Sequence, residues 1–386
     1  MASLIKLPMT HQTMFAELTS RCMDASFDQQ FPENGSFLQV EAKGRAYWYY
    51  SGYRPMPGGK GQGTRTRLYV GPVADPDITS RVSAFANIKA DFRERRQMVQ
   101  SLAAAGLPSP TGMVGNIVEE LWKGGFFRLR GVLIGTLSFQ TYCGYLGVRM
   151  PNAVSMTGDA DFAQFHSISA AVGDEMPPIL DVLHGADPTF RPLPHLAGPT
   201  QAAKFRNKLG FEVEFLTPNR GSEANQGKPS PMPALGGASA EPLRFLDYLI
   251  FSPVRSVLLH KGGIPVNVPA PERYAVHKLI VCMHRKDDDN GRRKAEKDLV
   301  QTSLLFEALE LEKRTIDIGF AWMEAWGRGV RWQHALSGGR ARLGPVGSKI
   351  LARAVSEACE ADRKDPSTFG YPTSGVSDIA GADDGP

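Results

Sequence analysis

The amino-acid sequence predicts an α/β (α+β) fold, with a core of strands and helices between an N-terminal module and a C-terminal helical domain. Residues 130–134 (RGVLI) form an apolar, β-branched run, and residues 135–147 then show the apolar spacing of a helix. Residues 158–165 (GDADFAQF) and 211–217 (FEVEFLT) alternate between polar and apolar positions, as half-buried strands do. From about residue 271 the apolar spacing is mostly helical. The expected core therefore combines strands and helices, and the region after it is helical.

Length and composition set outer limits on the protein. The chain has 386 residues with 42% apolar content, which is enough to bury a large core over two or three domains. Its net charge of +4 is too small to indicate nucleic-acid binding by itself. The sequence has no apolar stretch of the roughly 20 residues that cross a bilayer, and its first residues lack the apolar core of a secretory signal. We therefore expect a cytoplasmic location.

The cysteines do not indicate a metal site or a disulfide framework. The four cysteines, Cys22, Cys143, Cys282 and Cys359, are scattered along the chain without a C-x-x-C pair. They are most simply reduced thiols.

The N-terminal module is expected over residues 1–124, and its most distinctive part is residues 43–70. This stretch predicts a hairpin of two aromatic-rich strands around a Gly/Pro-rich loop, with six cations and no acid. The loop lacks the spacing of a Walker phosphate loop. Because cations contact phosphates and aromatic rings stack on unpaired bases, the hairpin is a candidate for binding RNA or DNA. The candidate acceptor-binding cations are Arg45, Lys60, Arg65 and Arg67. Alternatively, its tyrosines pack on the following helix and its arginines are exposed for solubility.

The junction at residue 135 is the first candidate site within the core. A strand ends there and a helix begins, so the first backbone N–H groups of the helix lack intrahelical partners and its dipole favours anions. Gly135 allows a ligand to approach closely, and Thr136 can cap the helix or donate a hydrogen bond. With Ser138 in the same turn, this pattern indicates a grip for nucleotide phosphates.

Asp159 and Asp161 form the second candidate site. Alternate side chains of a strand share a face, so both carboxylates point the same way. Two carboxylates a few Å apart repel each other, and a hard divalent cation such as Mg²⁺ relieves that repulsion. An Asp-x-Asp pair also occurs by chance on solvated strand faces and in turns.

A third carboxylate is expected from residues 211–217. In this strand the apolar residues share one face, and Glu212 and Glu214 share the other. Glu214 is the preferred candidate and Glu212 is the fallback. The alternative for both is a solvated strand face.

The strings LIGTLSFQTY, GDADFA and VEFLTP together resemble the nucleotidyltransferase fold of the DNA polymerase β-like superfamily. Within it they are most similar to the bacterial nucleotidyltransferase-like group related to abortive-infection and minimal nucleotidyltransferases. The resemblance covers roughly residues 125–310 and implies a mixed-sheet core over residues 125–270. In that family the third acid is typically Asp, so Glu214 is a departure.

The resemblance also implies a reaction. It is the transfer of a nucleoside monophosphate from an NTP to an acceptor hydroxyl, with Mg²⁺ or Mn²⁺ as cofactor and pyrophosphate as product. The implied site residues are the catalytic and metal-ligating acids Asp159, Asp161 and Glu214 and the NTP-binding residues Gly135, Thr136, Ser138 and Lys278. The acceptor, which can be RNA, a protein or a small molecule, stays open. The alternative is a catalytically silent member of the family that binds nucleic acid or a protein partner.

The remaining elements follow from local patterns. Residues 244–259 and 264–268 predict two further strands, and residues 271–365 predict the helical domain. On its first helix Lys278 is expected to neutralise triphosphate charge, or else to be a surface lysine. The charge run 285–294 predicts a solvated loop, and Asp298 is expected to pair with a nearby cation. Residues 366–386 are expected to be a disordered tail.

Overall fold

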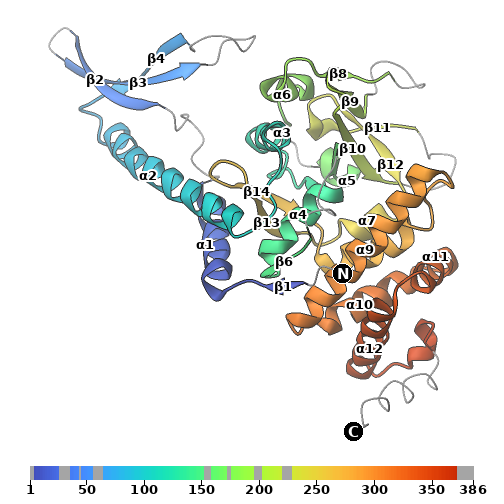
Figure 1. Cartoon of the computed structure of the whole chain (residues 1–386). Coiled ribbons are helices and arrows are strands. Elements are labelled where there is room, and N and C mark those ends of the chain that lie inside the picture. The colour runs from blue at the N-terminus through green and yellow to red at the C-terminus, as the bar shows by residue number, and fades with distance from the viewer. Residues whose placement is uncertain are drawn as a thin grey trace.

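The computed structural model shows a central sheet with surrounding helices, a small sheet at the end of a long helix, and a group of C-terminal helices (Figure 1). It describes residues 4–25, 35–42, 45–54, 64–151, 158–171, 175–194, 202–219 and 228–371.

In the part of the chain that the structure describes, the central sheet has seven strands and mixed pairing. The strands are β5 (Val132–Ile134), β7 (Asp159–Ala163), β8 (Arg191–Pro192), β9 (Lys204–Arg206), β10 (Glu212–Pro218), β11 (Ser230–Pro231) and β12 (Ser239–Leu243). Five of them run in the order β11-β12-β10-β7-β5, while β9 pairs with the first half of β10 and β8 pairs with β9. Strand β10 is parallel to β7 and β12, and β5 is antiparallel to β7. The predicted mixed α/β fold is therefore confirmed.

Alternation along the two central strands separates the core from the polar face. Ala160 and Phe162 of β7 and Val213 and Phe215 of β10 are all buried. The ring of Phe126 meets those of Phe162 and Phe215 edge-on, at centroid distances of 5.4 and 6.1 Å. This aromatic cluster fixes which face of the sheet is internal, and so places the intervening acids on the other face.

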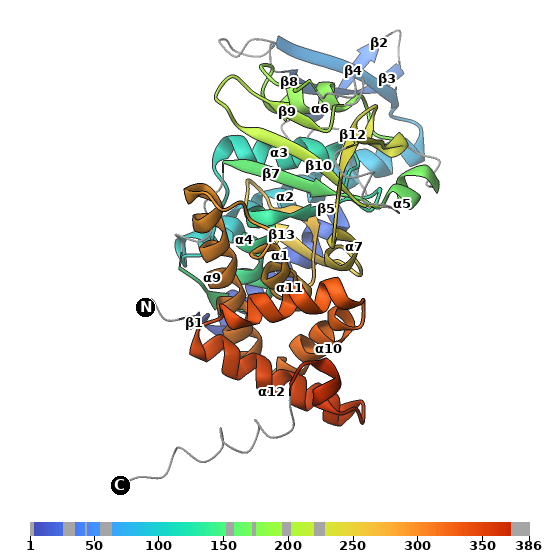
Figure 2. The ribbon, with the colours of Figure 1, turned by 90° about the vertical axis from the view of Figure 1, so that its right-hand side faces the viewer.

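Helices and one hairpin surround the central sheet (Figures 1 and 2). They are α3 (Gly112–Lys123), α4 (Gly135–Tyr145), α5 (His166–Ala171), α6 (Ile179–Ala186), α7 (Leu246–Leu249) and the antiparallel pair β13 (Val254–Leu258) and β14 (Ile264–Val268). The predicted strand over residues 244–259 is wrong in its first half. The chain turns at Phe245, whose φ is 64°, and then forms α7. A short apolar run does not distinguish a buried helix from a buried strand.

The C-terminal helices pack against one another beside the central sheet (Figure 2). They are α8 (Pro271–Val281), α9 (Asp289–Leu311), α10 (Thr315–Trp326), α11 (Val330–Ala341), α12 (Pro345–Ala361) and the 3₁₀ turn Pro366–Phe369. The charge run 285–294 is not wholly a loop, because the Asp288 carboxylate caps α9 by accepting a hydrogen bond from the Gly291 amide.

The predicted disordered tail is folded at its start. Trp322 donates its indole N–H to the carbonyl oxygen of Phe369 at 3.0 Å, and Phe369 is buried. Residues 372–386 lie outside the described residues.

The N-terminal part begins with β1 (Ile5–Lys6), which pairs with β6 (Val148–Arg149), and α1 (Met9–Ala25). It continues into a three-stranded antiparallel sheet and the long helix α2. These elements are β2 (Ser36–Ala42), β3 (Arg45–Arg54), β4 (Thr64–Pro72) and α2 (Pro76–Ala104). The predicted hairpin is present as β3 and β4, but β2 is an additional strand on the other edge of β3.

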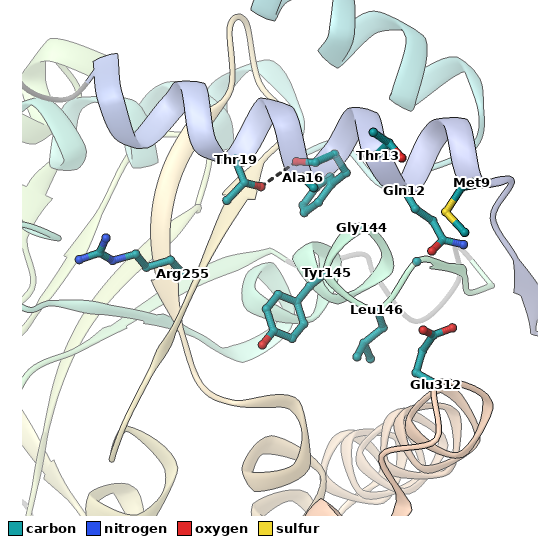
Figure 3. Close-up of a pocket in the computed structure, with 12 residues that line it drawn as sticks. Met9, Gln12, Thr13, Ala16, Thr19, Gly144, Tyr145, Leu146, Arg255 and Glu312 are labelled. Carbon is teal, nitrogen blue, oxygen red and sulfur yellow. Dashed lines mark hydrogen bonds between the residues drawn. The ribbon is translucent and has the colours of Figure 1, made fainter.

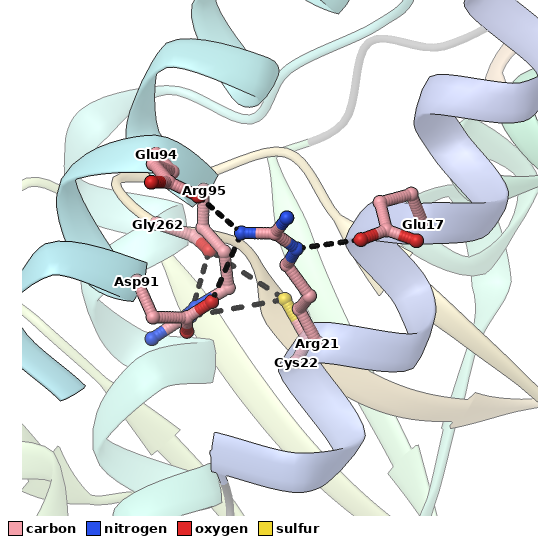
Figure 4. A network of polar contacts seen from close by, with 7 residues as sticks. All are labelled: Glu17, Arg21, Cys22, Asp91, Glu94, Arg95 and Gly262. Carbon is pink, nitrogen blue, oxygen red and sulfur yellow. Dashed lines mark hydrogen bonds and ion pairs between the residues drawn. The ribbon is translucent and has the colours of Figure 1, made fainter. Parts of the chain in front are cut away.

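Helix α2 is fixed to the body by a buried arginine (Figure 4). The Arg95 side chain is 2% exposed. It donates to the carbonyl oxygen of Gly262, between β13 and β14, at 2.9 Å and to the carboxylate of Asp91 at 2.8 Å. Arg21 of α1 reaches the carboxylates of Asp91 and Glu94. These contacts tie α2 to α1 and to the β13–β14 turn.

None of the helices in the described part of the chain combines the length and apolarity that crossing a bilayer requires. All four cysteines lie in the described part of the chain as buried thiols, and none of them forms a disulfide.

Candidate functional site

Strand pairing brings the predicted acids to one face of the central sheet. Asp161 of β7 is paired in register with Glu214 of β10, and Asp159 with Glu212. Residues paired across two strands project from the same face. Asp161 is also paired with Ile134, the last residue of β5. The acids therefore lie directly beside the start of α4.

Gly135 lies directly beside the carboxylate of Asp161. Its φ is +67°, and a Cβ atom built on it would lie 2.7 Å from a carboxylate oxygen of Asp161. Both the backbone conformation and the close contact require glycine here. The helix start and the carboxylate, which are separate sequence motifs, thus form one site.

The first turn of α4 has no side-chain cap. Ile134 occupies the N-cap position and makes no such hydrogen bond. Thr136 is half-buried. Ser138, the third residue predicted to bind phosphate in this turn, is fully buried, and its hydroxyl donates to the carbonyl oxygen of Gly135 at 2.8 Å. Ser138 therefore supports the turn, and Gly135 and Thr136 form the accessible part of it.

Lys297 of α9 reaches this turn from the C-terminal helices. Its ammonium group donates to the Thr136 hydroxyl at 3.1 Å. Burial, and then the charge of Lys278, lower the pKa of Lys297, while Asp159 acts in the opposite direction. The sequence analysis did not assign a role to Lys297. The available signal was its place beside Asp298 in a Lys-Asp pair.

Asp298 organises two more cations beside the site. Its carboxylate is 2% exposed and accepts from Lys278 at 2.6 Å and from Arg285 at 2.8 Å. Burial acts to raise the pKa of Asp298, but Lys278 and Arg285 outweigh it and hold the pKa below its usual range. The prediction that Asp298 pairs with a cation is confirmed. One carboxylate between two cations leaves a net positive charge, to which Lys297 adds.

Asp161 has too little positive charge around it to be ionised normally. Burial, and then the carboxylates of Asp159 and Glu214, raise the pKa of Asp161 to about 7. Lys278 and Lys204 act in the opposite direction but do not cancel the effect. An added cation would relieve this repulsion.

Glu214 is held by a cation that the sequence analysis did not identify. Lys204 of β9 is paired in register with Glu214, and its ammonium lies 3.0 Å from that carboxylate. Arg206 pairs with Glu212 in the same way. Burial raises the pKa of Glu214, and Lys204 opposes that rise. The sequence signal for this hairpin was a Lys-x-Arg pattern before a turn and a Glu-x-Glu pattern after it.

The three predicted acids do not form a complete metal cage. Among the residues that the structure describes, no group of three or more His, Cys, Asp or Glu side chains is placed to hold a metal ion. Mg²⁺, however, is usually held by one or two carboxylates together with substrate phosphates and water. The pair Asp159 and Asp161, with the raised pKa of Asp161, fits that kind of site.

The candidate acceptor-binding cations lie elsewhere. Arg45 is on β3, and Arg65 and Arg67 are on β4, in the small sheet at the far end of α2 (Figure 1). Lys60 falls outside the described residues. The structure does not bring these residues to the turn at Gly135.

A separate cavity lies at the opposite end of α4 (Figure 3). Its volume is about 530 Å³, and its lining includes Tyr145 and Gly147 at the end of α4, Arg255 of β13 and Glu312 after α9. Gly135, the acids and Lys297 do not line it.

Comparison with known proteins adds one match. The model of a family described as nucleotidyltransferase matches residues 112–327, which is more than half of the chain and includes the turn at Gly135, the acids and Lys297. No curated protein and no solved structure matches the chain.

Proposed function

Because the chain belongs to this nucleotidyltransferase family, we propose that it moves a nucleoside monophosphate from an NTP to an acceptor hydroxyl and releases pyrophosphate. The observation that carries the proposal is the contact between Gly135 and Asp161. It sets a helix start without a side-chain cap directly against a carboxylate that favours an added cation. A triphosphate with its metal ion has complementary charges.

The triphosphate would lie against the start of α4. The backbone at Gly135 and Thr136 can face phosphate oxygens, because an uncapped helix start offers unpaired N–H donors and a favourable dipole. Lys297, at 3.1 Å from the Thr136 hydroxyl, would supply a cation there. Lys278 would add positive charge from the Asp298 network. A compact ammonium group suits this role.

Asp159 and Asp161 would hold Mg²⁺ or Mn²⁺. Such an ion, when bound, supplies Lewis-acid chemistry at phosphoryl oxygens. Asp161 would release its proton on binding, since its pKa of about 7 leaves it partly protonated at neutral pH. Glu214 is our candidate for the third acid, facing the acceptor hydroxyl. The Glu214 carboxylate forms an ion pair with Lys204. To ligate a metal ion, Glu214 would have to give up this ion pair.

The direct test is release of pyrophosphate. Purified protein with each NTP, Mg²⁺ or Mn²⁺ and an RNA or lysate acceptor should release pyrophosphate and label the acceptor. Asp159→Asn and Asp161→Asn should each lower the rate by about 100-fold or more, as loss of a preorganised electrostatic group does. Asp181→Asn, on an exposed position of α6, is the matched control and should leave the rate unchanged.

A second candidate function is a catalytically silent family member that binds nucleic acid or a protein partner. The ion pair between Lys204 and Glu214 favours it, because this pair occupies the third acid without a metal. In that case biological activity would persist in the protein that carries both Asp159→Asn and Asp161→Asn, and no NTP would yield pyrophosphate.

A further inference from the structure

We propose that the small sheet β2–β4 binds single-stranded nucleic acid on the face that points away from α2. The bound strand would be the acceptor, and only this role rests on the proposed function. Three observations lead to the proposal: one face of the sheet is covered, the other gathers aromatic and basic positions, and that second face carries no acid.

The first face packs on α2. Phe37 and Tyr50 are paired across β2 and β3, and their rings meet that of Phe85 at centroid distances of 4.9 and 6.2 Å. Tyr50 is 2% exposed. On the same face, Trp48 donates its indole N–H to the Thr79 hydroxyl at 3.0 Å. This face is therefore internal.

The register assigns the remaining tyrosines to the other face. Tyr49 pairs with Tyr69, and Tyr53 pairs with Arg65. The register shifts between Trp48 and Tyr49, where β4 has one residue more than β3, so the alternation along β3 itself is unbroken. Alternate positions of a strand share a face, so the face opposite α2 can be listed from the register alone. Its aromatic and basic positions are Arg45, Tyr47, Tyr49, Tyr53, Arg65, Arg67 and Tyr69.

The charge of this face is of one sign. Across the three strands the only acid is Glu41, and its register partner Ala46 belongs to the face that packs on α2. The opposite face thus combines three arginine positions with four tyrosine positions. A basic groove with aromatic platforms is the arrangement that binds single strands without strong sequence preference. An acidic peptide would use the arginines but not the tyrosines.

The sequence analysis left two alternatives open for this hairpin, and each describes one face. Tyr50 packs on the following helix, as the structural alternative proposes. Tyr47 and Tyr49 occupy the opposite face and are half-buried. The nucleic-acid proposal therefore depends on this second set.

Fluorescence anisotropy with a labelled oligouridylate, an oligothymidylate of the same length and a duplex of matched length tests the proposal. The intact protein should bind a single strand more tightly than the duplex, and the comparison of the two single strands identifies RNA or DNA as the ligand. A variant that carries Arg45→Gln, Arg65→Gln and Arg67→Gln together should bind with a weaker salt dependence. The magnitude of the slope of log affinity against log salt concentration should fall by about 2, since each phosphate contact contributes about 0.7. The matched control removes three exposed lysines elsewhere on the protein, and its slope should change by less than that of the arginine variant. It carries Lys208→Gln, Lys286→Gln and Lys349→Gln.

Stacking is tested on Tyr47 and Tyr49. Tyr→Leu at both positions should weaken binding about fivefold to 100-fold, whereas Tyr→Phe at both should retain it. Circular dichroism and the melting temperature report whether each variant still folds as the intact protein does. Equal affinity of the Leu and Phe variants, or no preference for single strands, would overturn the proposal.

The enzymatic proposal and the nucleic-acid-binding proposal can be refuted independently of each other. Asp159→Asn with Asp161→Asn should bind the oligonucleotide as the intact protein does, because the acids lie on a different sheet. Pyrophosphate release without any oligonucleotide binding would refute the nucleic-acid proposal alone. Oligonucleotide binding with no pyrophosphate release from any NTP would support it and refute the enzymatic one.

Discussion

At the scale of single residues, Asp161 is the acid of the site whose pKa is raised to near neutrality. Burial and two neighbouring carboxylates raise its pKa to about 7, from an ordinary value of 3.8. The neutral form is thus favoured below about pH 7. In the proposed metal site, proton release and metal binding would be coupled at this side chain.

This coupling predicts a pH dependence. The unfolded chain loses the Asp161 proton near pH 3.8 and the folded chain near pH 7, so this group lowers the free energy of unfolding as pH rises through that window. Urea denaturation at several pH values should show this fall in the intact protein and a smaller one in Asp161→Asn.

The same proton competes with the metal. The increase in melting temperature caused by Mg²⁺ should therefore be larger at pH 8 than at pH 6. An increase that does not vary with pH would contradict the raised pKa.

Gly135 allows a second prediction at this scale. Gly135→Ala places a methyl group 2.7 Å from the Asp161 carboxylate and forces a positive φ on alanine. We expect a loss of about 1–3 kcal/mol in the free energy of unfolding, together with weaker Mg²⁺ binding. Both are measurable by denaturation with and without the ion. Gly112→Ala is the control, since a Cβ there meets nothing within 4 Å.

Some site residues were predictable from sequence because their placement depends on local geometry. Asp159 and Asp161 share a face because strand side chains alternate, and Gly135 stands where a strand pattern changes to a helix pattern. Lys297 contacts Thr136 across 161 positions of the chain. No local pattern encodes such a contact, so its role could not be predicted.

At the scale of elements, the strands and helices of the core follow their hydrophobic periods. Strand β10 begins at Glu212, one residue from the expected position, with its glutamates on the polar face. The strand predicted over 244–259 is wrong in its first half because this run is apolar without a clear period. No sequence pattern marked the turn at Phe245, after which the chain forms α7. Strand β2 was not predicted from the sequence.

The packing of α9 against the start of α4 predicts the effect of a substitution. Lys297→Gln removes the cation beside Thr136, and we expect KM for the NTP to rise about tenfold or more, because a hydrogen bond to a charged group is lost. Steady-state kinetics of pyrophosphate release measure it. Lys294→Gln, on an exposed position one turn earlier, is the control. Equal KM values for the two variants would exclude Lys297 from the NTP site.

At the scale of the whole molecule, Arg95 sets how the N-terminal helix joins the body. Its guanidinium links Asp91 of α2 to the carbonyl oxygen of Gly262, and both partners would lose a charge-assisted bond without it. This attachment could not be predicted, because it joins segments 167 positions apart.

Arg95→Ala should lower the free energy of unfolding by about 2 kcal/mol, since it removes two hydrogen bonds of a buried charged group. Chemical denaturation measures this loss. Arg96→Ala, at the neighbouring exposed position, should change the free energy of unfolding by less than about 0.5 kcal/mol. Similar losses for the two variants would show that the buried contacts do not fix α2.

Between Pro76, where the small sheet is attached, and Arg95, the helix rises about 29 Å at 1.5 Å per residue. This length of helix would separate an acceptor bound to the small sheet from the body of the protein. A very short oligomer could occupy either the tyrosine platform or the reaction centre, whereas a longer one could engage both at once. Acceptor size, rather than base identity, would then decide which molecules are extended.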